Sequence, residues 1–234
     1  VKKLLFSSKT KTVAQIIDEL GGSLTLGGAS MLQVQNGTLE IPQNYVGITS
    51  HAMSSMKSKG VKKIVIPASV RMIMPNAFSM LDSLEEVIFA DGTDHIDNYA
   101  LCGCKNIKRI GIPASVKRIG AGAFMNLASL QGIRLPAALD EISDELFSGC
   151  TSLAHISFGG AIKRVGAGAF YGCSSLRTVM LPDSVESIGI SAFWECTSLQ
   201  RLFIPAATKT LSQSSLSNCP SLMSLYMPRI IHDQ

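Results

Sequence analysis

The sequence predicts a solenoid, a single stack of similar coils that each add a strand to a parallel β-sheet. Three features predict this fold: an internal repeat of 23 residues, an alternation of apolar and polar residues within each repeat, and a proline that ends most of the alternating segments. Stepping by 23 residues meets the column Phe78, Leu101, Phe124, Phe147, Phe170, Phe193 and Leu216. The same step from Leu84 meets Ile107, Leu130, Leu153, Leu176, Leu199 and Leu222, so the units share one register without an insertion.

The alternating segment of each unit is expected to be a strand on the concave face of the solenoid. In residues 86–90, Val87 and Phe89 alternate with Glu86 and Ile88, so one pair faces the core and the other faces outward. A proline can follow such a segment because the ladder of backbone hydrogen bonds has ended there. The prolines are Pro67, Pro113, Pro136, Pro182, Pro205 and Pro228, and Ala90 and Gly159 stand at this position in two units.

The rest of each unit is expected to return along the convex face. Residues 116–120 contribute Val116 and Ile119 to two further apolar columns, which indicates a short extended piece. Residues 121–127 then predict one or two helical turns. The unit with Ala90-Asp91-Gly92-Thr93-Asp94-His95 lacks the proline and the valine of the pattern, so the pattern does not predict its convex turn.

The chain is expected to divide into an N-terminal cap at residues 1–41, repeats at residues 42–228 and a C-terminal tail at residues 229–234. A cap is expected because the end of a solenoid must cover an otherwise open core. Within it, Asn36-Gly37 between alternating residues predicts a hairpin with a type I′ turn. Four apolar residues have the spacing of one face of a short helix: Val13, Ile16, Ile17 and Leu20. The first repeat, residues 42–67, is irregular and two residues longer than the others.

Several strings of the repeat are specific enough to indicate one family. The order I-P-x-S-V-x-x-I-G-x-x-A-F-x-G-C-x-S-L recurs over about residues 42–228, for example in Ile112-Pro113-Ala114-Ser115-Val116 and Ala169-Phe170-Tyr171-Gly172-Cys173. The chain thereby resembles the BspA-like leucine-rich repeat family. The resemblance implies a secreted or cell-surface protein of an anaerobic bacterium or a mucosal protozoan, adhesion to host extracellular proteins and to other microbes, and no catalytic motif.

Composition excludes several classes of protein. An apolar content of 46% excludes a disordered chain, and a net charge of +4 without any Lys/Arg run longer than two excludes an electrostatic nucleic-acid surface. No apolar stretch approaches the roughly 18 residues of a membrane span, so we expect a chain that is not membrane-spanning.

Residues 1–6 resemble the start of a signal peptide, but polar residues 7–10 end the apolar run too early. Either the chain has no signal peptide or it begins after its removal, and the extracellular or cell-surface location assumes the second.

Five of the six cysteines occupy one column of the repeat: Cys104, Cys150, Cys173, Cys196 and Cys219. Leu81 and Leu127 are its other members, so the column requires an apolar side chain and the cysteines are expected to be buried free thiols. Equivalent side chains point in parallel, which disfavours disulfides between coils. Cys102-Gly103-Cys104 is a weak metal or redox motif because it has no second pair of ligands, and we expect no metal and no cofactor.

No pattern in the sequence indicates an enzyme, and no catalytic residue is assigned. Gly120-Ala121-Gly122 and Gly166-Ala167-Gly168 share one phase of the repeat and lack the third glycine of a nucleotide-binding loop. The histidines lie at unrelated phases, so they predict neither a triad nor a metal site: His51, His95, His155 and His232.

The outward columns of the strands are where a partner is expected to bind. Met180, Phe203 and Tyr226 place apolar side chains on three successive strands, and Arg201 lies on the same strand as Phe203. Aromatic residues, Met and Arg are the types enriched at protein interfaces. The predicted partner-binding residues are Met180, Phe203, Tyr226, Arg201, His155 and Arg134. The alternative is that the apolar side chains pack beneath the C-terminal tail.

The sequence therefore favours a non-enzymatic, protein-binding module whose adhesion to host extracellular matrix proteins or other cells rests on the resemblance. The alternative function is a carbohydrate-binding or structural scaffold module of a longer cell-envelope protein. Phe203 and Tyr226, with His155 adjoining, are the side chains that could stack on sugar rings.

Overall fold

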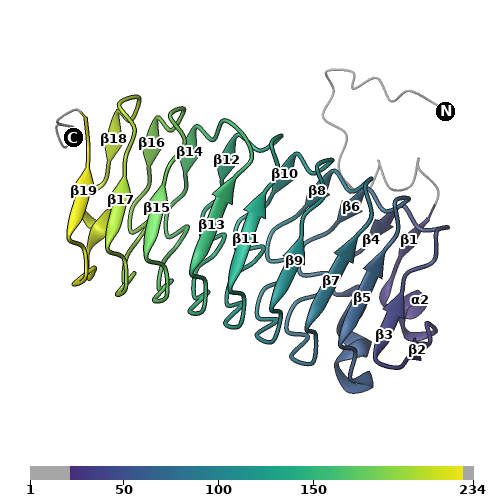
Figure 1. Cartoon of the computed structure of the whole chain (residues 1–234). Helices are drawn as coiled ribbons and strands as arrows, with labels where there is room; N and C mark the ends of the chain where they lie inside the picture. Colours follow the sequence, from purple (N-terminus) through teal and green to yellow (C-terminus); the bar gives the residue numbers. More distant parts are fainter. Residues whose placement is uncertain (1–21, 229–234) are drawn as a thin grey trace, which may run out of the picture.

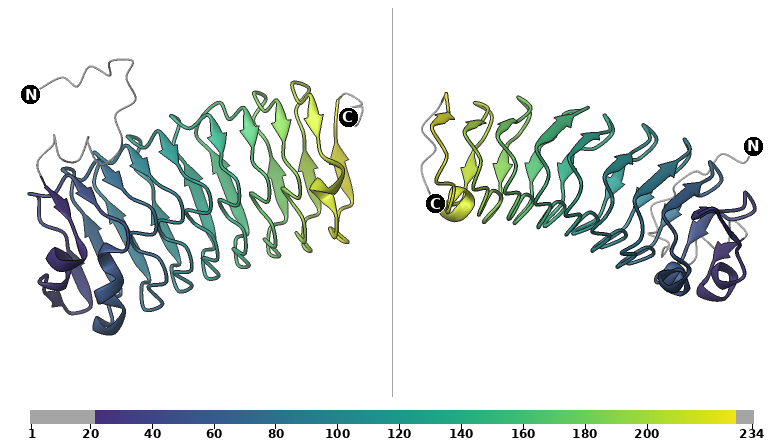
Figure 2. Two further views of the ribbon diagram at one scale, coloured as in Figure 1. Left: turned by 180° about the vertical axis from the view of Figure 1, so that it is seen from behind. Right: turned by 60° about the horizontal axis from the view of Figure 1, so that its bottom comes forward.

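The computed structural model describes residues 22–228, which form a stack of parallel coils. Each coil adds one strand to a main sheet and one shorter strand to a second sheet, and tight turns connect them (Figure 1). Figure 2 shows that the stack bends along its length. The helix predicted over residues 13–20 and the C-terminal tail lie outside the described residues.

The main sheet consists of the alternating segments, as the sequence predicts. Its strands are β2 (Val34–Gln35), β3 (Thr38–Glu40), β5 (Lys63–Ile66), β7 (Glu86–Phe89), β9 (Arg109–Gly111), β11 (Gly132–Leu135), β13 (His155–Phe158), β15 (Thr178–Met180), β17 (Arg201–Phe203) and β19 (Ser224–Tyr226). Val87 lies opposite Ile110, which confirms the 23-residue register, whereas Leu39 lies opposite Ile64 because the first repeat is longer.

The second sheet is formed by the short extended pieces. Its strands are β1 (Ser23–Leu24), β4 (Gly47–Ile48), β6 (Met72–Ile73), β8 (His95–Ile96), β10 (Arg118–Ile119), β12 (Glu141–Ile142), β14 (Arg164–Val165), β16 (Ser187–Ile188) and β18 (Thr210–Leu211). Strand β8 forms although the pattern does not predict its unit, and it pairs with both β6 and β10. Thr93 makes this possible, since it is fully buried in the valine column and its hydroxyl donates to the Val70 carbonyl at 2.8 Å.

The expected hairpin is present at the N-terminal end. Strands β2 and β3 pair antiparallel, and the turn residues Asn36 and Gly37 have φ angles of 50° and 77°, which a type I′ turn requires. A five-residue helix that the sequence did not predict, α2 (Leu26–Ser30), precedes the hairpin. Thr25 caps it by accepting a hydrogen bond from the Gly28 amide.

The connection after the second-sheet strands β6 to β16 is a tight turn, and residues 121–127 do not form the helix expected there. Every second backbone amide of this segment donates to a carbonyl within the same turn, and the amides between them donate to carbonyls of the next coil. The consecutive backbone hydrogen bonds of a helix therefore cannot form. The donors to the next coil are Gly122 to Asp144, Phe124 to Leu146 and Asn126 to Ser148. Two 3₁₀ helices do occur, one in the longer first repeat and one in the last turn: Ala52–Lys59 and Gln213–Leu216.

The core contains two ladders of identical side chains. Phe124, Phe147, Phe170 and Phe193 are fully buried, with ring centroids 5.8, 5.6 and 5.2 Å apart in that order. Beside them, each column cysteine lies within hydrogen-bonding distance of a phenylalanine carbonyl one coil earlier, as Cys150 Sγ does at 3.1 Å from the Phe124 oxygen. All six cysteines are free; Cys102 and Cys219 are half-buried, and the other four are buried.

Both sheets are interrupted between the same two coils. The main sheet has no pairing between β9 and β11, and the second sheet has none between β10 and β12, so the turn segments carry the backbone bonds across this junction. The Ser143 hydroxyl donates to the Ile119 carbonyl there, in the place where other coils use a backbone amide. A second interruption, between β13 and β15, affects the main sheet alone.

Charges alternate strictly along one column beside the second sheet. The column is Arg71, Asp94, Lys117, Asp140, Lys163, Glu186 and Lys209. Arg71 forms an ion pair with Asp94, and Lys209 forms one with Glu186 at 2.7 Å. Neighbouring coils therefore meet with opposite charges at this column.

Candidate binding surface

Three of the predicted partner-binding residues form a continuous apolar ridge. Met180 lies opposite Phe203 in the β15–β17 pair, and Phe203 lies opposite Tyr226 in the β17–β19 pair. The Phe203 and Tyr226 ring centroids are 5.8 Å apart with the ring planes inclined by 42°. Met180 and Tyr226 are exposed by 65% and 56%, and Phe203 between them is half-buried. We call these three residues the ridge.

Arg201 lies on the same strand as Phe203, one pleat along. Its guanidinium is exposed, and Nε donates to the Thr178 hydroxyl at 3.3 Å across the β15–β17 pair. This bond holds the side chain beside the ridge while leaving further N–H groups available to a carboxylate. The ridge and Arg201 thus form one surface on the last three strands of the main sheet.

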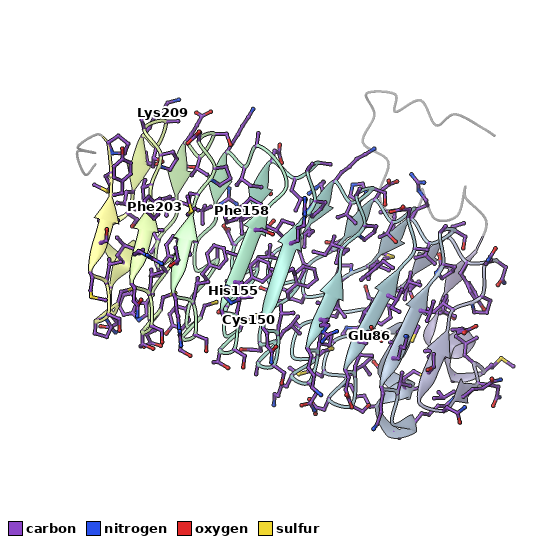
Figure 3. All side chains as sticks on the ribbon, viewed as in Figure 1. Glu86, Cys150, His155, Phe158, Phe203 and Lys209 are labelled. Carbon is purple, nitrogen blue, oxygen red and sulfur yellow. The ribbon has the colours of Figure 1, made fainter. Side chains whose placement is uncertain are left out.

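His155 and Arg134 lie beyond the interruption between β13 and β15. Both are exposed, on the paired strands β13 and β11, and no strand pairing connects these strands to β15, where the ridge begins. Figure 3 shows His155 and Phe158 on one side of this interruption and Phe203 on the other.

Beside this interruption, two side chains that the sequence assigns to the core are partly exposed. Ile156 and Phe158 face inward on β13 but are only half-buried, whereas Leu135 and Leu181, in the same column as Phe158 on the flanking coils, are 0% and 6% exposed. A hollow of about 400 Å³ lies between β13 and Met180. The sequence signal for this irregular coil is Gly159-Gly160, which stands where most other units have a proline.

Within residues 22–228, no three His, Cys, Asp or Glu side chains converge as metal ligands would. Burial raises the pKa of the Cys102 thiol, so this cysteine is not an activated nucleophile. Burial also lowers the pKa of His95, with nearby Arg118 adding to the effect. A hollow of about 740 Å³ at the turn edge near the C-terminal end is lined mainly by small polar side chains such as Thr151, Ser174 and Thr197, together with Glu195.

Helices of the described segment are too short to cross a bilayer.

Comparisons with known proteins agree with this architecture. A family model described as the BspA type leucine rich repeat region matches in six copies, over residues 49–174 and 117–233. No curated protein sequence matches the chain.

Solved structures of bacterial leucine-rich repeat proteins share the fold. One from Eubacterium ventriosum is 23% identical, with a TM-score of 0.56 over 82% of this chain and 61% of that one. The T. pallidum leucine-rich repeat protein is 24% identical, with a TM-score of 0.52 over 83% of this chain and 76% of that one. The chain spans less than two thirds of the E. ventriosum protein.

Proposed function

The chain belongs to the BspA type leucine-rich repeat family, and from this premise we propose that it is a non-enzymatic module of a secreted or cell-surface bacterial protein that holds a protein partner against its main sheet. The partner is an extracellular protein of a host or of another cell, and the module serves adhesion. Extended repeat sheets offer a long, rigid surface that suits recognition of a macromolecule.

The ridge is the observation that supports a protein partner. Met180, Phe203 and Tyr226 expose apolar surface on successive strands, where a monomeric protein in water gains nothing from exposing it. A single partner can cover all three because the strands are about 4.8 Å apart. Arg201 beside them can orient an acidic group of the partner.

The geometry of the two rings disfavours the carbohydrate alternative. Sugar rings stack on flat aromatic faces, and the 42° inclination between Phe203 and Tyr226 does not present a common plane. An irregular apolar side chain of a protein packs against two inclined rings more readily. The structural scaffold alternative does not explain why apolar side chains of the ridge are exposed.

The test is binding to panels of host extracellular matrix proteins and of glycans, run side by side. For a matrix protein that binds, Phe203→Ala with Tyr226→Ala should weaken binding at least about tenfold, because apolar anchors of this kind contribute about 2 kcal/mol or more each. The far-UV circular dichroism spectrum should not change.

Trp194→Ala is the control. Trp194 is half-buried on the turn edge, away from the main sheet, so its loss should leave binding intact. If the control weakens binding of the matrix protein equally, or if the double variant does not weaken it, the ridge is not part of the binding site. Binding to the glycan panel alone would contradict the protein partner.

A further inference from the structure

The two halves of the main sheet differ in how their charges are balanced. In the N-terminal half, Lys62 and Lys108 lie 3.7 and 3.4 Å from Glu85, and Lys63 lies 3.0 Å from Glu86, so the two glutamates balance part of the positive charge there. In the C-terminal half, strands β11, β13, β15, β17 and β19 contain no Asp or Glu. That half of the sheet is therefore basic.

Three arginines carry this charge: Arg134, Arg177 and Arg201. All three are exposed, and none forms an ion pair with another residue between 22 and 228. A partner with carboxylates on its surface would complete guanidinium pairs that the fold itself does not make. The charge thus favours an acidic partner and disfavours a basic one.

A hollow of about 400 Å³ lies on the coils between β11, which carries Arg134, and β17, which carries Arg201. We call it the slot, and its lining is Ile156, Ser157, Phe158, Gly159, Gly160, Met180 and Pro182. Its volume is at the lower end of the roughly 300–1,000 Å³ found for ligand sites, so one side chain suits it better than a large ligand. Met180 of the ridge forms part of its wall, so the slot and the ridge are continuous.

Two glycines that follow β13, Gly159 and Gly160, form one end of the slot. A Cβ atom on Gly159 would lie 2.5 Å from the Leu135 carbonyl oxygen, and one on Gly160 would lie 2.1 Å from the Ala137 carbonyl oxygen. Only glycine allows the backbone to approach the preceding coil this closely. The chain here packs onto the coil of β11, and the pairing that is missing is the one with β15 on its other side.

We propose that the partner of the main sheet is an acidic protein segment that inserts one aromatic or aliphatic side chain into this slot. The proposal rests on the proposed function and specifies its partner. The inserted side chain covers Ile156 and Phe158, while carboxylates on either side of it pair with Arg134, Arg177 and Arg201.

Random twelve-residue peptides displayed on phage provide the probe, because no natural ligand is needed. Peptides selected on the whole chain should be acidic and share one aromatic or large aliphatic residue. Two variants should each weaken a selected peptide at least about tenfold: the triple variant Arg134→Gln, Arg177→Gln, Arg201→Gln, and Ser157→Phe, which places a ring over the slot.

Matched controls come from the other half of the sheet. Lys62→Gln with Lys63→Gln removes two charges there, and Gly111→Phe adds a ring in the same outward column as Ser157, where a Cβ atom would meet nothing within 4 Å. Both should leave binding unchanged, and all variants should keep the far-UV spectrum of the parent.

The outcomes separate this inference from the function on which it rests. Peptides without acidic bias that still depend on Phe203 and Tyr226 would overturn the acidic partner and leave the binding surface in place. Selection of no peptide, or only of peptides that ignore the ridge, would count against both. A third outcome is that no peptide is selected but the chain binds heparin. If that binding is lost in the triple arginine variant and unchanged in Ser157→Phe, the arginines bind a polyanion and the acidic protein partner is wrong.

Discussion

At the scale of single residues, the cysteine column shows how one side chain meets two requirements. The position must be apolar and compact, and leucine fills it at Leu81 and Leu127. A thiol adds a weak donor beside the phenylalanine carbonyl one coil earlier, at 3.1 to 3.2 Å in all five cases. Burial also raises the pKa of Cys104 and of Cys150 to about 12, which keeps these thiols protonated and unreactive near neutral pH.

These raised pKa values predict that the protein loses stability in alkali. Below the ordinary thiol pKa of 9.0, both folded and unfolded chains hold the proton, so the stability is fully present. As pH rises from about 9 towards 12, the unfolded chain releases protons that the folded chain retains. The free energy of unfolding should then fall by roughly 1.4 kcal/mol per pH unit for each buried thiol, measured by urea denaturation.

The double variant Cys104→Ala, Cys150→Ala isolates this effect from the titration of lysines and tyrosines. Its stability should depend on pH less steeply than that of the parent chain above about pH 9, although its stability at neutral pH should be lower. An unchanged slope would mean that the buried thiols do not control the alkaline response.

At the scale of elements, the turn segment holds neighbouring coils together most consistently. Its backbone bonds persist at both interruptions of the main sheet, and the stacked phenylalanine rings lie beside it. Phe147 is fully buried between Phe124 and Phe170 and so contacts two coils at once.

Phe147→Ala should therefore destabilise the fold by about 3–5 kcal/mol, from lost burial and from the cavity left between two rings. The change is measured as a shift of the denaturant midpoint. Phe147→Leu is the matched control, because Leu101 and Leu216 occupy the same column, and it should cost clearly less than the alanine variant. A midpoint unmoved by alanine would refute the burial of this column.

The sequence predicted the elements well wherever one coil resembles the next. Fixed spacing identifies inward residues such as Val87 and Phe147 because every unit must bury the same face. It does not reveal how completely each unit covers its inward face, since Ile133 and Ile156 occupy the same column although one is buried and the other half-buried. The helical turn expected over residues 121–127 failed for a related reason: its amides bond to a neighbouring coil, which local periodicity does not register.

The candidate site was predicted in part. The ridge follows from strand phase alone, so Met180, Phe203 and Tyr226 share a face as expected. The missing strand pairing between β13, which carries His155, and β15, where the ridge begins, is a three-dimensional feature that strand phase does not predict.

At the scale of the whole molecule, the junction where both sheets stop divides the described chain into two blocks. Strands β1 to β10 form one and strands β11 to β19 form the other. Across the junction, Phe124 and Phe147 make the loosest ring pair, with planes inclined by 34° against 13° and 9° in the next two pairs. The stability of a solenoid is approximately the sum of the interaction free energies between adjacent coils. A weak interaction between two coils therefore allows the blocks on either side of it to unfold separately.

Hydrogen exchange should reveal the two blocks. Phe170→Ala should reduce amide protection in β15 and β17 and leave β5 and β7 protected, because the weak junction limits how far the damage spreads. The reciprocal variant Phe78→Ala should reduce protection in β5 and β7 and spare β15 and β17. Loss of protection along the entire stack in either variant would show that the chain unfolds as one unit.

The alternating charge column also bears on how such a chain can change its length. Removing the single coil that contains Glu186 would bring Lys163 next to Lys209, so two like charges would face each other. Removing the coils of Lys163 and Glu186 together would bring Asp140 next to Lys209 and keep the alternation. Although the apolar core repeats with every coil, the electrostatic pattern repeats with every second one. Gene duplications and deletions that add or remove coils in pairs preserve both patterns, whereas those that change the count by one preserve only the core.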